Sequence, residues 1–134
     1  MKYTFLPHTA DVKFQAYGKT LAEAFINSAL ATRKVMTEDN IKEVEEKTFT
    51  VTATKKETLL YEFLEHLLFL VDTEGFILSE IKSLTIKDNV LTATITGDNA
   101  DNYEIQTHIK AVTYSDMFIK EEENQVTIQV VHDI

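Results

Sequence analysis

The sequence predicts an α+β fold in which two helices pack on one face of a mixed, largely antiparallel sheet. Two segments, one after Thr20 and one before Gly75, carry apolar residues at helical spacing. After Gly75 the chain changes to a run of segments with the pattern of strands. Helices that precede a separate run of strands are typical of the α+β class, and the short spacing between the final strands favours antiparallel pairing.

At the N-terminus, residues 3–6 and 12–17 are predicted as two short strands that flank a loop. Apolar and polar residues alternate in the second strand, which is the pattern of a half-buried strand. Pro7 has no amide hydrogen to donate to a sheet, so it suits the break between the two strands.

Both helices carry start or stop signals. Thr20-Leu21-Ala22-Glu23 has the spacing of a capping box, and the helix that follows it should end between Arg33 and Met36. Thr54-Lys55-Lys56-Glu57 has the same spacing and should open the second helix. A broad apolar stripe predicts that this second helix is largely buried, and Gly75 suits the left-handed position that ends it.

The remaining strands are predicted from alternation and from turn residues. Asp88-Asn89 is a plausible hairpin turn, and Val112 and Tyr114 should be buried in a central strand. The predicted strands cover residues 48–54, 76–87, 90–96, 105–114 and 126–131.

Composition and charge limit the classes of function. The 134 residues predict one domain that spans 1–134, and the absence of cysteine excludes disulfides and thiolate metal sites. The N-terminus lacks the layout of a signal peptide, and the longest apolar run is too short to cross a bilayer, so we expect a cytoplasmic protein without membrane association. Because the net charge is −9, we expect no direct binding of nucleic acid.

Two aspartates near the chain ends suggest a metal site. Asp11 and Asp133 each stand beside apolar residues with a strand pattern. Neither of the stretches that contain them, Leu6–Asp11 and Val130–Ile134, includes Lys or Arg. A buried carboxylate without a partner is costly, and a cation would be one such partner. With the α-carboxylate of Ile134 the site would have three hard oxygen groups, which suit Ca²⁺ or Mg²⁺. Alternatively, Asp11 caps a turn or pairs with a distant Lys, and Asp133 belongs to a solvated tail.

The four histidines do not have the spacing of a zinc site. His8 is expected to fix the loop by a hydrogen bond to Asp11. His66 is expected at the surface of the second helix, and His108 and His132 in strands.

Several short motifs together resemble the archease family. They are Pro7-His8-Thr9-Ala10-Asp11, Gly18, Lys110-Ala111-Val112-Thr113-Tyr114, and a chain that ends in Asp133-Ile134. Their order, spacing and total length all fit. The chain departs from the family pattern at Ser115, where His is common, and at Phe63, where Trp is frequent.

The resemblance implies an archease-like fold and a protein that activates the GTP-dependent tRNA-splicing RNA ligase without being an enzyme itself. It would promote guanylylation of the ligase's active-site histidine and support multiple turnover. The family is also linked to modulation of tRNA methyltransferases. By position, the family's metal ligands become Asp11, Asp133 and the terminal carboxylate of Ile134, with Ca²⁺ the preferred cation and Mg²⁺ the alternative. Lys110 would be a charge near this acidic site, and Thr113 could bond a metal-bound water.

Two other classes stay open. A small metal-dependent hydrolase would need a water on the metal and a base, for which His8 is the nearby candidate. A chaperone-like binder, for example a modulator of tRNA-modifying enzymes, would need no metal.

Overall fold

The computed structural model describes residues 1–8 and 10–134, so Thr9 of the loop motif lies outside the described residues. Within these residues, seven strands, two α-helices and one short 3₁₀ helix follow one another. The strands are β1 (Tyr3–Leu6), β2 (Asp11–Gly18), β3 (Glu45–Thr52), β4 (Phe76–Lys87), β5 (Val90–Asn99), β6 (Ala111–Glu121) and β7 (Val126–Asp133). The helices are α1 (Leu21–Met36), α2 (Lys56–Glu74) and η1 (Ala100–Asn102).

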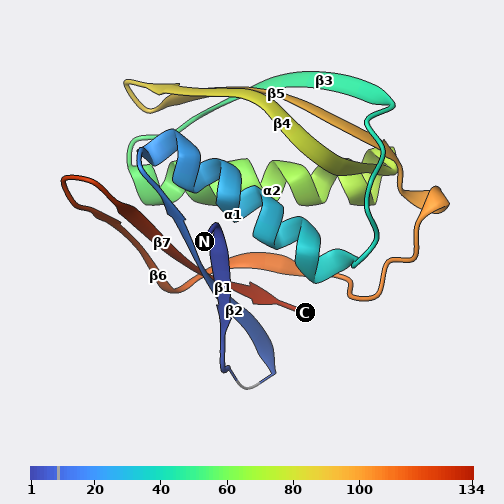
Figure 1. Ribbon diagram of the computed structural model, residues 1–134, viewed down its shortest axis with the longest axis horizontal. Coiled ribbons are helices and arrows are strands. Elements are labelled where there is room, and N and C mark those ends of the chain that lie inside the picture. Colours follow the sequence, from blue (N-terminus) through green and yellow to red (C-terminus); the bar gives the residue numbers. More distant parts are fainter. Residues whose placement is uncertain (9) are drawn as a thin grey trace.

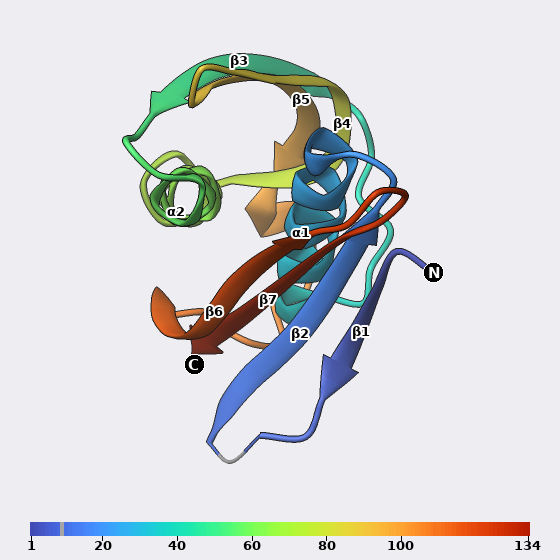
Figure 2. The same ribbon diagram turned by 90° about the vertical axis from the view of Figure 1, so that its left-hand side faces the viewer.

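The strands form two antiparallel sheets, one with the order β1-β2-β7-β6 and the other with the order β3-β5-β4. Both α-helices lie between the two sheets (Figures 1 and 2). The predicted α+β class, with two helices and largely antiparallel strands, is confirmed. The strands form two sheets rather than one, so the helices are covered from both sides.

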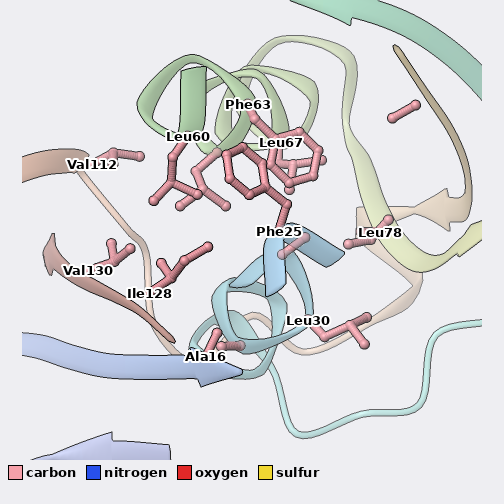
Figure 3. Close-up of a cluster of buried hydrophobic side chains, with 14 of the residues drawn as sticks. Ala16, Phe25, Leu30, Leu60, Phe63, Leu67, Leu78, Val112, Ile128 and Val130 are labelled. Carbon is pink, nitrogen blue, oxygen red and sulfur yellow. The ribbon is translucent and has the colours of Figure 1, made fainter. Parts of the chain in front are cut away.

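The width of the apolar stripe on α2 explains the second sheet. Seven of its side chains are buried, and they spread around more than one face of the helix. One sheet covers one face of a helix, so burial on this scale requires a second layer. Figure 3 shows Phe63 and Leu67 of α2 packed against Phe25 of α1, with Ile128 and Val130 of β7 on another side of the cluster.

Thr20 caps α1 as predicted, although the described residues show no return bond from the Thr20 amide to the Glu23 side chain, and the second capping box does not form. The Glu23 amide donates to the Thr20 hydroxyl oxygen at 3.1 Å, and α1 ends at Met36. The N-cap of α2 is Lys55 rather than Thr54, and no side chain caps it. The Thr54 carbonyl instead accepts a hydrogen bond from the Asn89 side chain, so Thr54 belongs to the contact with the hairpin.

The turn residues act as predicted. Gly75 has φ +64°, and its amide donates to the carbonyl oxygens of Leu70 and Val71, which ends α2. Asp88 and Asn89 both have positive φ, at +52° and +58°, as a two-residue hairpin turn of type I′ requires.

The predicted strand at 105–114 is wrong in its bounds. Residues 103–110 lie outside the strands because the amides of Gln106 and Thr107 donate to the Met36 carbonyl at the end of α1. His108 therefore precedes β6, and its Nε2 lies 3.3 Å from Oδ1 of Asp72.

Tyr114 is also not where alternation predicts it. The pairing of β6 with β7 shifts register between Thr113 and Phe118, and this irregularity breaks the two-residue period. Val112 is buried as predicted, but Tyr114 is 53% exposed and stacks on Tyr61 of α2 with ring centroids 4.5 Å apart. No helix in the described residues has the length and apolar character needed to cross a membrane.

Candidate metal centre

The pairing of β2 with β7 brings the two candidate aspartates together. Asp11, the first residue of β2, and Asp133, the last residue of β7, are direct partners across the two strands, which lie side by side in Figures 1 and 2. Directly opposite side chains point to the same face of a sheet, with Cβ atoms about 5 Å apart. Two residues from opposite ends of the sequence therefore share one small patch of surface.

The immediate neighbours of Asp11 leave its charge largely uncompensated. Nδ1 of His8 lies 3.4 Å from Oδ2 of Asp11, as expected for a loop-fixing contact. Lys13, the nearest basic residue along β2, points its amine at Asp116 instead, at 3.2 Å. Within the described residues, no Lys or Arg forms an ion pair with Asp11 or Asp133.

Asp133 belongs to the sheet rather than to a loose tail. It is the last residue of β7, and its carbonyl accepts a hydrogen bond from the Lys110 amide at 2.7 Å. The side chain of Ile134 is half-buried and packs against the main core. This packing holds the main chain of Ile134 next to Asp133. A terminal carboxylate on Ile134 would add a third anionic group there.

His132 fixes the other face of the same strand. It is fully buried, and its Nε2 lies 2.9 Å from the Thr32 hydroxyl oxygen on α1. Because that hydroxyl donates to the Ser28 carbonyl, it accepts from His132, so the proton of the neutral ring sits on Nε2. Nδ1 has no hydrogen-bond partner among the described residues.

Burial lowers the pKa of His132 to about 4, because a charged ring here would lose its hydration without gaining an acceptor. A neutral, buried ring thus ties β7 to α1 immediately before Asp133. In the sequence, alternation places His132 on the same face of the strand as Val126, Ile128 and Val130, which indicates burial. Its contact on a distant helix could not be predicted from the sequence.

The donor chemistry of the patch fits a hard divalent cation. Two carboxylates about 5 Å apart repel by about 1 kcal/mol in water and about 3 kcal/mol at an effective dielectric constant of ~20. A Ca²⁺ or Mg²⁺ ion would reverse the sign of that term and would find the oxygen donors it prefers. No cluster of three or more His, Cys, Asp or Glu side chains suited to a metal occurs in the described residues. The candidate set differs from such a cluster, because its third donor is a main-chain carboxylate.

The other family-like positions lie near the pair. The main chain of Lys110 contacts Asp133, and its side chain is exposed. Thr113 donates to the Val131 carbonyl at 2.8 Å and accepts from the Ser115 amide at 3.3 Å, so its hydroxyl supports the irregularity in β6. A cavity also borders Asp11, and its lining residues are Phe5, Leu6, Asp11, Val12, Lys13, Lys34, Val35 and Thr107.

A family model and several known proteins match nearly the whole chain. The family model described as "Archease protein family (MTH1598/TM1083)" matches residues 3–134. The chain is 36% identical to the protein archease of Methanothermobacter thermautotrophicus, with 98% of each chain covered. It is 37% identical to that of Aeropyrum pernix, with 95% of this chain and 93% of the relative covered.

Two solved structures share the fold. The solution structure of Methanobacterium thermoautotrophicum protein 1598 matches with a TM-score of 0.83 and 36% identity, covering 98% of each chain. The crystal structure of an archease from Thermotoga maritima, described as a possible chaperone, matches with a TM-score of 0.64. It is 21% identical and covers 96% of this chain and 94% of that one.

Proposed function

The chain belongs to the archease family, and from that premise we propose that it is a non-catalytic protein cofactor of the GTP-dependent tRNA-splicing RNA ligase. In this proposal it promotes guanylylation of the ligase's active-site histidine and supports multiple turnover. Family membership supports the choice of partner.

The proposed activator works through a divalent-cation site. Asp11, Asp133 and the terminal carboxylate of Ile134 would hold the ion, with Ca²⁺ preferred and Mg²⁺ the alternative. The observation that carries this proposal is the direct pairing of Asp11 with Asp133 and the absence, in the described residues, of a Lys or Arg ion partner for either. A bound cation would balance two carboxylates that form no ion pair with Lys or Arg in the described residues.

The rest of the chain positions this site. His132 and Thr32 hold β7 on α1, and Lys110 holds the main chain of Asp133. The net charge of −9 supports action on a protein that holds RNA, rather than on RNA itself.

A guanylylation assay with the purified ligase tests the proposal. The intact protein should raise the rate of ligase–GMP formation, and Asp11→Asn should abolish that increase. Asp88→Asn, which removes the same charge at the β4–β5 turn, should activate like the intact protein. Equal activation by folded Asp11→Asn would remove the proposed role of the site.

One contact favours a second candidate, a small metal-dependent hydrolase. Nδ1 of His8 lies 3.4 Å from Oδ2 of Asp11, where a base could serve a metal-bound water. Turnover of a phosphoester by the purified protein alone, lost in His8→Ala, would support this candidate against the ligase activator.

A further inference from the structure

In the described residues the two sheets have four edge strands, and β3 is the long one whose pairing has no register shift. Exposed edges offer main-chain groups to other chains, and proteins usually shorten or bulge them. β1 has only four residues, and β4 and β6 carry register shifts. Within the described residues, β3 alone pairs in regular register over a long edge, from Glu45 to Thr52 against β5.

The threonines of β3 direct their main-chain groups away from the sheet. The amide of Ala53 donates to the Asn89 carbonyl. Hydrogen-bonded and non-bonded pairs alternate along an antiparallel ladder, so Val51, Phe49 and Lys47 also direct their main-chain groups to β5. The residues between them, Thr48, Thr50 and Thr52, form the non-bonded pairs. In agreement, the hydroxyls of Thr48 and Thr94 lie 3.0 Å apart, as the closer side chains of such pairs allow. Their N–H and C=O groups therefore face the free edge.

An aromatic groove runs between this edge and α2, whose position beside β3 is visible in Figure 2. The rings of Phe49 and His66 are 4.1 Å apart, and those of His66 and Phe69 are 5.8 Å apart. Phe69 is 45% exposed, and His66 is half-buried rather than at the surface as predicted. A cavity opens here, and its lining residues are Lys47, Thr48, Phe49, His66, Leu70 and Glu74.

The rim of the groove is acidic. Helical spacing places exposed Glu62 on the same face of α2 as His66 and Phe69. Glu45 and Glu74 border the other end, and both contact the amine of Lys47, at 3.2 and 2.9 Å. One amine shared by two carboxylates leaves net negative charge along the groove.

We propose that the β3 edge binds an extended, Lys/Arg-rich segment of a partner protein as an added strand. The main-chain groups of Thr48, Thr50 and Thr52 would pair with the segment. One bulky apolar side chain of the segment would rest on Phe69 and His66, and its basic side chains would lie beside Glu62 and Glu74. A second copy of this chain fits less well, because it would bring the same acidic rim and another net charge of −9 to the interface.

This surface is separate from the candidate metal centre. β3 belongs to one sheet and Asp11 and Asp133 to the other, with the helices between them (Figure 1). A substitution at Asp11 or Asp133 should therefore leave binding at the β3 edge unchanged.

A labelled peptide of about ten residues, the length of a long strand, provides the probe. Threonine would alternate with lysine, and one central lysine would be replaced by phenylalanine. Fluorescence anisotropy should show saturable one-to-one binding. A peptide of the same sequence with every main-chain amide N-methylated keeps the charge but has no amide hydrogen to donate to β3, and it should bind at least about tenfold more weakly. Equal binding of the two peptides would overturn the proposal, because it would indicate charge attraction alone.

Substitutions in β3 and at Phe69 test strand addition in proteins that should still fold. Thr50→Pro removes an outward-facing amide donor and the exposed contact between the Thr50 and Thr92 hydroxyls, but no main-chain bond to β5, so the protein should fold and lose at least about tenfold in affinity. Thr50→Val keeps the donor and should bind within about twofold of the intact protein. Phe69→Ala should weaken binding while β3 stays intact. Unchanged affinity in folded Thr50→Pro would contradict the inference. So would sedimentation equilibrium that shows the intact protein as a dimer and Thr50→Pro as a monomer, because a second copy of the chain would then occupy the edge.

Discussion

Nε2 of His132 lies 2.9 Å from the hydroxyl oxygen of Thr32, so a hydrogen bond joins the inner face of β7 to α1 one residue before Asp133. Strand residues alternate between faces, and the buried His132 therefore presents Asp133 on the outer face next to Asp11. The position of the candidate ligand depends on a contact in the core.

The buried histidine should make stability depend on pH. The pKa of His132 is about 4 in the folded protein and about 6.5 in an unfolded chain. The contribution of neutral His132 to the free energy of unfolding is fully present above pH 6.5. It is lost as the pH falls from about 6.5 to about 4, because in this range the unfolded chain binds a proton at His132 and the folded protein does not. The total loss should be about 3 kcal/mol.

Urea unfolding in EDTA between pH 7.5 and 4 checks this pH dependence. His132→Phe has no titrating group at this position and should show a shallower fall over the same range. Identical pH profiles for the two proteins would show that His132 is not the source.

Helix capping should differ between the two threonines that have a capping-box sequence. Thr20→Ala removes the hydrogen bond to the Glu23 amide and should cost about 1 kcal/mol of unfolding free energy. Thr54→Ala should cost clearly less, because Thr54 is not the N-cap of α2 and its carbonyl is retained. Urea denaturation of both variants measures the difference, and equal losses would refute this assignment of the cap.

These caps illustrate how much of the fold could be predicted from the sequence. Thr20, Gly75 and Asp88-Asn89 act through residues close to them in the chain, so local pattern identified them. Thr54 has the same local pattern as Thr20, but its environment depends on the distant Asn89.

The remaining errors also arise from contacts over long sequence distances. β6 begins late because Gln106 and Thr107 bond to Met36, and Tyr114, which is exposed, lies where the register shifts against β7. Alternation within one strand contains no information about either. For the candidate site, the sequence predicted Asp11 and Asp133 as a pair, whereas the role of His132 and Thr32 appeared only in the structure.

A divalent cation should raise the melting temperature. At a hundredfold excess over its dissociation constant, the ion adds about 2.7 kcal/mol by mass action. For a domain of this size the shift should be about 10 °C. Thermal scans in EDTA and in millimolar Ca²⁺ or Mg²⁺ measure it, and superimposed curves would show that no such site exists.

Extension of the C-terminus should weaken the site without unfolding the protein. In a chain that ends at Ile134, a Gly-Ser tail moves the α-carboxylate away and leaves a neutral carbonyl in its place. The packing of Ile134 on the core is retained, so the fold should survive while metal stabilisation and ligase activation are lost. A Gly-Ser extension before Met1, which is 93% exposed, is the matched control and should have no effect. Full metal stabilisation in the C-terminally extended protein would exclude the terminal carboxylate as a ligand.

Calorimetric titration with Ca²⁺ tests most directly whether the Asp11–Asp133 pair holds a cation. The intact protein should bind one ion, and Asp88→Asn should bind it with the same affinity. Asp11→Asn and Asp133→Asn, each shown to be folded by circular dichroism, should each lose at least about tenfold in affinity, because an amide is a weaker ligand than a carboxylate for a hard cation. Equal Ca²⁺ affinity in all four proteins, or no binding by the intact protein to either Ca²⁺ or Mg²⁺, would contradict the proposed site.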